Sequence, residues 1–178
     1  MNYEKFCQIL NFYLFGNEKR ELLKKIALHP ERFIGLFRPS KAGAKILQNI
    51  LQSREIKFGD ALEKIFEEIV VDLGYKTLDK TIVKENGERL ELDLFFTDGN
   101  KFFFVEMKVR DDHDSSKKRG QITNFEAKLE ELFKIYDNKL IAIMYFVDPY
   151  FVKNQNFYLK ELSKLEMYYG VSTYLFYG

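Results

Sequence analysis

The segment between residues 89 and 109 constrains the fold more than any other part of the chain. Two apolar, β-prone runs, residues 89–96 and 101–109, flank the sequence Thr97-Asp98-Gly99-Asn100. An Asp-Gly pair between two such runs favours a tight β-hairpin. The sequence therefore predicts two antiparallel neighbouring strands in the middle of the chain.

The expected hairpin register gathers acidic side chains on one face of the sheet. Three cross-strand pairs are predicted: Phe96 with Lys101, Asp93 with Phe104, and Glu91 with Glu106. Cross-strand partners project to the same side of a sheet. We therefore expect Glu91, Asp93, Glu106 and Lys108 to share a face, together with Phe95, Phe102 and Phe104. A slip of one residue would separate Asp93 from Glu106, whereas a four-residue loop would keep them together.

Three carboxylates and a lysine in one place indicate a metal site suited to phosphodiester chemistry. Mg²⁺ prefers oxygen ligands and commonly uses one or two carboxylates while keeping several waters. A neighbouring lysine supplies a positive charge that can position water and phosphate. Phenylalanines on the same face predict a half-buried cluster, where carboxylates without a cation would be costly. Zinc is not expected, because the chain has only Cys7, His29 and His113 as soft or imidazole ligands.

The remaining pattern predicts an α/β fold with a mixed central β-sheet flanked by helices. Residues 1–57 form an expected N-terminal helical, basic segment, and residues 58–178 an expected catalytic core with the order α-β-β-β-α-β-α-β. The predicted strands are 76–84, 89–96, 101–109, 140–146 and 171–176, with an Asn86-Gly87 turn between the first two. A helix ending at Gly74 precedes them, and another is expected to begin after Gly120.

Asp93 followed by Glu106-x-Lys108 on adjacent strands, after a helix carrying Gly59 and Glu63, resembles the PD-(D/E)XK nuclease superfamily. The resemblance covers roughly residues 58–148 and is strongest to bacterial type II restriction endonucleases. It implies a restriction-endonuclease-like αβββαβ core in which Asp93 and Glu106 bind Mg²⁺, with Mn²⁺ able to substitute. It also implies Lys108 as the residue that orients water, Glu63 as an accessory carboxylate, and Met107 within the metal site. Leu92 stands where this superfamily often has proline.

The charge distribution suggests where DNA is held. Residues 1–57 contain 11 Lys and Arg against 5 Asp and Glu, and residues 58–178 contain 17 against 22. Basic charge away from an acidic metal site suits an enzyme that holds a polyanion with one part and binds divalent cations with another. The expected DNA contacts are Lys41, Lys45 and Arg54 in the basic segment, and Arg110, Lys117, Lys118, Arg119 and Gln121 in and after a polar loop. His113 in that loop is expected to be solvated.

The resulting hypothesis is a metal-dependent type II restriction endonuclease that hydrolyses double-stranded DNA at a specific sequence. As the resemblance implies, the phosphate would stay on the 5′ end of the product. Two alternatives remain open at this stage: a repair or junction-resolving nuclease of the same fold, and a non-catalytic DNA-binding module. The intact trio of Asp93, Glu106 and Lys108 argues against the second.

The number of sites per chain and the lack of long apolar stretches predict the assembly and location of the protein. One visible site cuts one strand, so double-strand cleavage favours a homodimer. No apolar stretch is long enough to cross a bilayer, and the start of the sequence has no secretory pattern. We therefore expect a cytoplasmic protein without a membrane partner.

Overall fold

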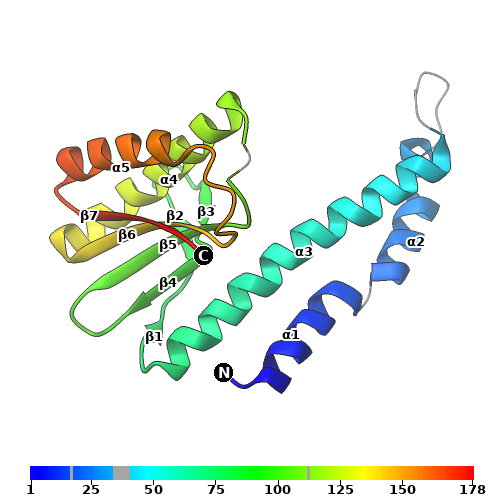
Figure 1. Cartoon of the computed structure of the whole chain (residues 1–178), viewed down its shortest axis with the longest axis horizontal. Coiled ribbons are helices and arrows are strands. Elements are labelled where there is room, and N and C mark those ends of the chain that lie inside the picture. Colours follow the sequence, from blue (N-terminus) through cyan, green and yellow to red (C-terminus); the bar gives the residue numbers. More distant parts are fainter. Residues whose placement is uncertain (17, 34–40, 112) are drawn as a thin grey trace. The chain divides into compact units, whose positions relative to one another are not determined.

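The computed structural model describes residues 1–16, 18–33, 41–111 and 113–178. The chain divides into two compact units, Met1–Ile65 and Phe66–Gly178. The elements of each unit are labelled in Figure 1. In the part of the chain that the structure describes, no helix is both long and apolar enough to span a membrane.

The N-terminal unit is helical, as expected. It contains α1 (Tyr3–Phe15), α2 (Glu18–Leu28), the short η1 (Pro30–Arg32) and the first part of α3 (Ala42–Asp72). Asn2 caps α1 through its side-chain oxygen, which accepts a hydrogen bond from the Lys5 amide at 2.9 Å. Helix α3 continues without a break through residues 57 and 58, where the sequence pattern changes.

The C-terminal unit is built on a five-stranded mixed sheet with the order β1-β4-β5-β6-β7. Its strands are β1 (Lys76–Thr77), β4 (Leu94–Thr97), β5 (Phe102–Lys108), β6 (Leu140–Phe146) and β7 (Ser172–Tyr177). β1, β4 and β5 pair in antiparallel fashion, whereas β5, β6 and β7 are parallel. The expected mixed sheet with flanking helices and an N-terminal helical segment is therefore confirmed.

Helices cover this sheet through two apolar layers. On one face, α4 (Ser115–Tyr136) and α5 (Gln155–Tyr169) pack over the sheet (Figure 1). Phe104 at the centre of this layer stacks on Phe125 of α4 with ring centroids 5.1 Å apart. On the other face, Phe66 and Val70 from the C-terminal part of α3 join Met107 and its neighbours in a second cluster. The alternation of apolar residues along β5 supplies both layers.

Two of the predicted strands are each divided. Residues 76–84 form β1 and the separate β2 (Thr81–Val83), and residues 89–96 form β3 (Arg89–Glu91) and β4. β2 and β3 make their own two-stranded sheet around the expected Asn86-Gly87 turn, where Gly87 has a φ of +81°. The division places Asp93 between two strands and leaves it outside the regular ladder.

The predicted hairpin register is wrong by two residues. Thr97 pairs with Phe102 and Phe96 with Phe103, so the loop comprises residues 98–101. The Asp98 side chain stabilises this longer loop by accepting hydrogen bonds from the amides of Asn100 and Lys101 at 2.8 and 2.7 Å. These amide hydrogen bonds lower the pKa of Asp98. A two-residue shift preserves the face of every side chain, so Glu106 and Lys108 stay on the expected face of the sheet.

Helix α4 begins earlier than the sequence pattern predicts. Asp114 is its N-cap and accepts hydrogen bonds from the amides of Ser116 and Lys117 at 3.0 and 2.8 Å. Gly120 consequently lies inside the helix rather than before it. Much of the expected polar loop is therefore the first turn and a half of α4, and Asp112 lies outside the described residues.

Candidate active site

Asp93 lies at the C-terminal end of β5 although it belongs to the segment before β4. Its Oδ2 accepts a hydrogen bond from the backbone amide of Met107 at 2.7 Å, and its own carbonyl accepts one from Lys80 Nζ at 3.1 Å. The amide contact ties the carboxylate to the strand that carries Glu106 and Lys108. Asp93 is thus adjacent to Glu106 and not to Phe104, which corrects the predicted pairing.

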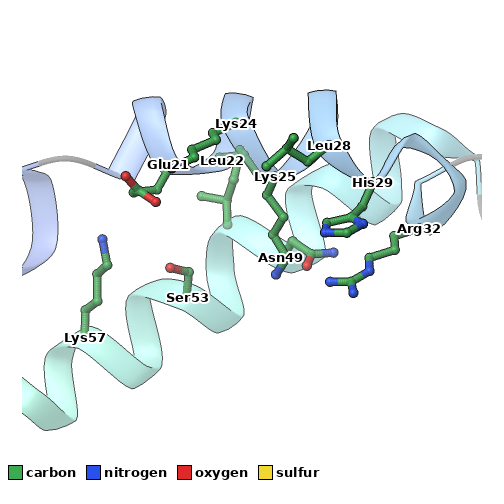
Figure 2. A pocket seen from close by; sticks show the side chains of 11 residues that line it. Glu21, Leu22, Lys24, Lys25, Leu28, His29, Arg32, Asn49, Ser53 and Lys57 are labelled. Atoms are coloured by element: carbon green, nitrogen blue, oxygen red, sulfur yellow. The ribbon is translucent and has the colours of Figure 1, made fainter.

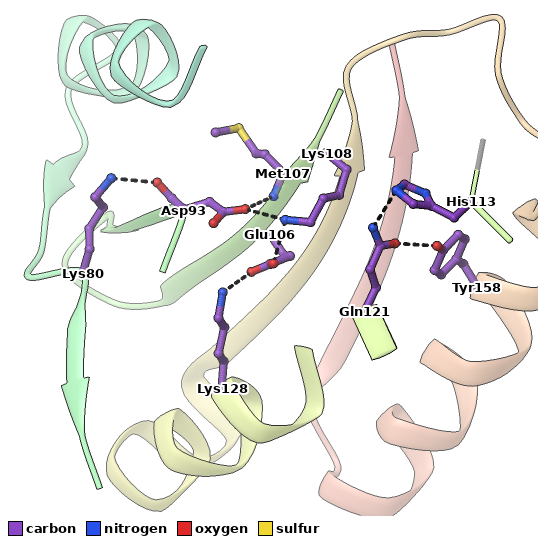
Figure 3. Close-up of polar contacts among 9 residues, drawn as sticks. All are labelled: Lys80, Asp93, Glu106, Met107, Lys108, His113, Gln121, Lys128 and Tyr158. Carbon is purple, nitrogen blue, oxygen red and sulfur yellow. Dashed lines mark hydrogen bonds and ion pairs between the residues drawn. The ribbon is translucent and has the colours of Figure 1, made fainter. Parts of the chain in front are cut away.

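Glu106 is a buried carboxylate held by two lysines. It is 2% exposed, and Lys108 Nζ lies 2.9 Å from Oε1 and 3.3 Å from Asp93 Oδ2. Lys128 Nζ of α4 lies 2.6 Å from Glu106 Oε2. Figure 3 shows the four side chains converging from β5, α4 and the segment before β4. Two negative and two positive groups therefore balance one another in a half-buried cluster.

The environment of Lys108 keeps it charged. Burial by itself lowers the pKa of Lys108, but the charges of Glu106 and Asp93 and the hydrogen bonds to both outweigh burial and raise the pKa above the usual lysine value. Lys108 is therefore an ammonium at neutral pH. Its side chain is 30% exposed, so this ammonium can also be reached from solvent.

The sequence interpretation missed Lys128. It is three residues after Phe125 and four before Leu132, so it occupies the buried face of α4, and it is 4% exposed. A lysine on the apolar face of an amphipathic helix is the signal that could have revealed it, because buried lysines are almost always paired. Removing one member of a buried ion pair typically lowers the free energy of unfolding by about 3–5 kcal/mol, so loss of Lys128 should destabilise the protein.

The donor set suits a hard divalent cation. Asp93 and Glu106 offer carboxylate oxygens, and one ammonium already contacts an oxygen of each, so the two acids can share a single cation. Among the described residues no group of three or more His, Cys, Asp and Glu side chains could hold a metal. Two carboxylates are nevertheless sufficient for Mg²⁺, which retains several waters.

Other predicted metal-site residues take different positions. Glu91 was expected opposite Glu106, but it lies in the separate β2–β3 sheet and accepts a hydrogen bond from Thr81 Oγ1 at 3.1 Å. The side chain of Met107 packs in the apolar cluster on the opposite face of the sheet, so only its backbone faces Asp93. Glu63 lies on α3 in the N-terminal unit, and its role remains a prediction.

A pocket extends from Glu106 and Lys108 along the start of α4. Its lining residues are Glu106, Lys108, His113, Lys117, Gly120, Gln121 and Asn124. His113 is not the expected solvated residue. Its Nε2 lies 3.0 Å from Gln121 Nε2, and the Tyr158 hydroxyl donates to Gln121 Oε1 at 2.6 Å (Figure 3). This chain of contacts fixes the Gln121 amide at the wall of the pocket.

The remaining residues of the predicted DNA-binding segment differ in whether their side chains are exposed or already engaged by other residues of the protein. Lys118 donates to Asn154 Oδ1 at 3.1 Å and lies over the Phe157 ring, so its role is partly structural. The Arg110 guanidinium lies 5.2 Å from the Phe151 ring centroid and near Asp148. Lys117 and Arg119 are exposed. Among these residues, Lys117 and Gln121 line the pocket that contains Glu106 and Lys108.

A buried polar network anchors the segment that follows β5. Asp111 is fully buried and accepts hydrogen bonds from the Asn154 amide at 2.7 Å, from its side chain at 2.8 Å and from the Tyr177 hydroxyl at 2.8 Å. Burial, together with Asp111, raises the pKa of Tyr177. The network fixes Asp111, which follows the end of β5.

The N-terminal unit has a basic pocket of its own. Its cationic lining comprises Lys24, Lys25, Arg32 and Lys57, and the acidic Glu21 also lines it, together with His29, Asn49 and Ser53 (Figure 2). The three residues predicted to contact DNA in this unit do not line the pocket. Lys41 is exposed, Lys45 donates to Gln48 at 3.0 Å, and Arg54 lies over the Phe15 ring. Their DNA contacts remain predictions.

Comparison with known proteins identifies one matching family. Residues 76–178 match the sequence profile of the family described as HinfI, type II restriction endonuclease. No curated protein matches the chain. A solved structure of Can2 from Sulfobacillus thermosulfidooxidans, in complex with cyclic tetra-adenylate (cA4), aligns with 97% of this chain at a TM-score of 0.45 and 13% identity. The aligned region covers 53% of the Can2 chain, so this chain spans about half of its length.

Proposed function

The chain belongs to the HinfI family of type II restriction endonucleases, and on that premise we propose that it is a metal-dependent enzyme that cuts double-stranded DNA at a specific sequence. Family membership supports nuclease activity and agrees with the expected likeness to type II restriction endonucleases. The proposal of metal-dependent DNA cleavage rests on the cluster of Asp93, Glu106 and Lys108. In this cluster the Lys108 ammonium lies 3.3 Å from an oxygen of Asp93 and 2.9 Å from an oxygen of Glu106.

Asp93 and Glu106 are the proposed ligands of Mg²⁺, with Mn²⁺ able to substitute. A cation bound there lowers the pKa of its water and offsets charge on the phosphate. Asp93 is oriented for this role by the Met107 amide. Glu106 is oriented by Lys128. Both acids are therefore held in place before any ligand arrives, which is the arrangement that electrostatic catalysis requires.

Lys108 acts in this proposal as the positioning charge for the reacting groups. Its ammonium can donate to the attacking water and to a non-bridging phosphate oxygen, because it has three donors and part of it is exposed. The water oxygen forms a bond to phosphorus while the bond from phosphorus to the 3′ oxygen breaks. The attacking water gives up a proton to solvent, the 3′ oxygen takes a proton from solvent and leaves as a hydroxyl, and the phosphate stays on the 5′ end.

DNA contacts are proposed at the pocket along α4, where Lys117 and Gln121 line the same pocket as Glu106 and Lys108. Lys117→Ala should weaken binding equally for all sequences and reduce the log-log salt slope by about one unit, because one phosphate contact is lost. Lys139→Ala is the matched control, since Lys139 is exposed before β6, at the opposite end of the strand from the site. Equal slopes for the wild type and Lys117→Ala would remove Lys117 from the interface.

The basic pocket of the N-terminal unit is proposed as a second contact with the DNA backbone. Its four cationic side chains, contributed by α2, η1 and α3, suit phosphate and carry no base-specific geometry. This assignment gives the excess positive charge of residues 1–57 a function. In this proposal the N-terminal unit contacts the DNA backbone, whereas the C-terminal unit contains the site that cuts the DNA.

We propose a homodimer as the working assembly, since each chain contributes one Asp93–Glu106–Lys108 site and each strand needs one. A two-fold axis relating two chains matches the symmetry of a palindromic sequence. Light scattering at micromolar protein, with and without DNA, should give the mass of two chains in at least one state. A strict monomer in both states, accompanied by accumulating nicked circles, would contradict the dimer.

Sequencing of product ends tests the proposed specificity. A long DNA of known sequence is incubated with the protein and Mg²⁺, and the ends are mapped. The proposal predicts that all ends carry a 5′ phosphate and share one short sequence. Ends clustered at branched structures would favour a repair or junction-resolving nuclease, and bound but uncut DNA would favour a binding module.

A further inference from the structure

Lys128 is a buried charge that the expected catalytic residues do not account for. Its side chain is 6% exposed and that of Glu106 is 3% exposed, and their charged atoms lie 2.6 Å apart. The lysine projects from the buried face of α4, where Phe125, Leu129 and Leu132 also lie. A side chain enclosed in this way cannot leave Glu106 without disturbing the helix packing.

The two oxygens of Glu106 are therefore not equivalent. Oε2 is occupied by Lys128, whereas Oε1 shares the Lys108 ammonium with Asp93. Lys108 is partly exposed and can exchange its contacts when a ligand enters. Lys128 has no comparable access to solvent. Only Oε1 is thus placed to be shared with Asp93 by an incoming cation.

We propose that Lys128 is a positioning residue that confines Glu106 to single-oxygen coordination and so favours Mg²⁺ over Ca²⁺. The inference rests on the proposed metal-dependent function of the same site. Mg²⁺ has octahedral coordination, binds few carboxylate oxygens and keeps several waters. Ca²⁺ binds six to eight oxygens and can be coordinated by both oxygens of one carboxylate. Because Lys128 occupies Oε2 of Glu106, the two oxygens of Glu106 cannot both coordinate one cation. This two-oxygen coordination would benefit Ca²⁺ and not Mg²⁺.

Lys128 also balances charge at the site. The formal charges of Asp93, Glu106, Lys108 and Lys128 cancel, and loss of Lys128 leaves a net negative charge. Both cations should then bind more tightly to a variant without this ammonium, with the larger gain for Ca²⁺. A purely structural ion pair would instead lower stability and leave the ratio of the two affinities unchanged.

The test compares cation binding by the wild type and Lys128→Met, which keeps the length of the side chain without its charge. Isothermal titration calorimetry with Mg²⁺ and with Ca²⁺, in the absence of DNA, measures both affinities. We expect the Ca²⁺ affinity relative to that of Mg²⁺ to rise about tenfold or more in Lys128→Met. Lys134→Met is the matched control on the same helix, because Lys134 is 52% exposed and pairs with Glu131. An unchanged ratio in Lys128→Met would overturn the proposal.

A second measurement uses the wild type alone, in case Lys128→Met does not fold. Infrared difference spectra of protein labelled with ¹³C-glutamate separate the Glu106 carboxylate bands from those of Asp93. A wide splitting of the two stretching bands with either cation is expected, as single-oxygen coordination produces. A narrow splitting would overturn the inference and leave the metal-dependent function intact. Failure of both cations to bind the wild type would overturn both together.

Discussion

Glu106→Gln is expected to reduce DNA cleavage about a thousandfold or more. The change removes the negative charge that attracts the cation at the position where the structure concentrates two lysines on one carboxylate. Glutamine preserves the volume of the side chain and keeps an oxygen that can accept from a lysine. It is therefore preferable to alanine, which would leave Lys128 buried without a partner.

Initial cleavage rates on one duplex substrate measure this effect, with circular dichroism as the check on folding. Glu88→Gln is the matched control, because Glu88 is an exposed glutamate that pairs with Lys84 on the β2–β3 hairpin. It should cut like the wild type. Wild-type rates for a folded Glu106→Gln would mean that another site performs the reaction.

Removal of divalent cations is the second change with a large expected effect. EDTA should abolish turnover, and Mg²⁺ or Mn²⁺ should restore it, because in the proposed mechanism a cation held by Asp93 and Glu106 activates the attacking water. Ca²⁺ should support DNA binding with little turnover, since its looser coordination activates water less well.

Parallel assays separate binding from chemistry. Fluorescence anisotropy with a labelled duplex gives the affinity in EDTA, Ca²⁺ and Mg²⁺, and gel analysis of the same samples gives the extent of cutting. Asp93→Asn is the companion variant and should be insensitive to the cation supplied. Full cutting in a buffer whose metal content has been verified as negligible would exclude the proposed roles of Asp93 and Glu106.

The sequence predicted which face of the sheet Glu106 and Lys108 share, but not the register of the hairpin. Alternation along a strand has a period of two, so a shift from Phe96–Lys101 to Phe96–Phe103 pairing left Glu106 and Lys108 on the face of Phe104. The register itself depends on the Asp98 side chain, which binds two amides of the loop. Such a side-chain contact is hard to distinguish in advance from the simpler turn that Asp-Gly also permits.

The residues around the acids were harder to predict, because they depend on how elements pack. The spacing between Glu91 and Asp93 predicted that both lie in the site. Glu91 instead ends β3 of the two-stranded sheet, whereas Asp93 precedes β4 of the five-stranded sheet. Lys128 was missed because it lies 22 residues after Glu106 in the sequence and reaches Glu106 only after α4 packs on β5. Local spacing identified Asp93, Glu106 and Lys108, whereas the partner that fixes Glu106 required the tertiary fold.

The start of α4 illustrates a similar limit. The apolar positions that mark this helix begin at Ile122, so the pattern suggested a start after Gly120. Asp114 nevertheless caps a helix that begins at Ser115, and this extension places Lys117 beside the pocket. An acidic residue followed by serines was the capping signal available in the sequence. It carries less weight than periodicity because such residues are also common in loops.

The most direct test of the central claim is a single-turnover digest of supercoiled plasmid in Mg²⁺, with the wild type and Glu106→Gln in parallel. The plasmid carries one copy of a sequence recovered from the mapped product ends, or a mixture of plasmids is used if none has been recovered. We expect the wild type to produce linear DNA with one fixed pair of ends, and Glu106→Gln to leave the plasmid supercoiled while still binding it. Uncut plasmid with a folded, DNA-binding wild type, or equal cutting by both proteins, would contradict the proposed function.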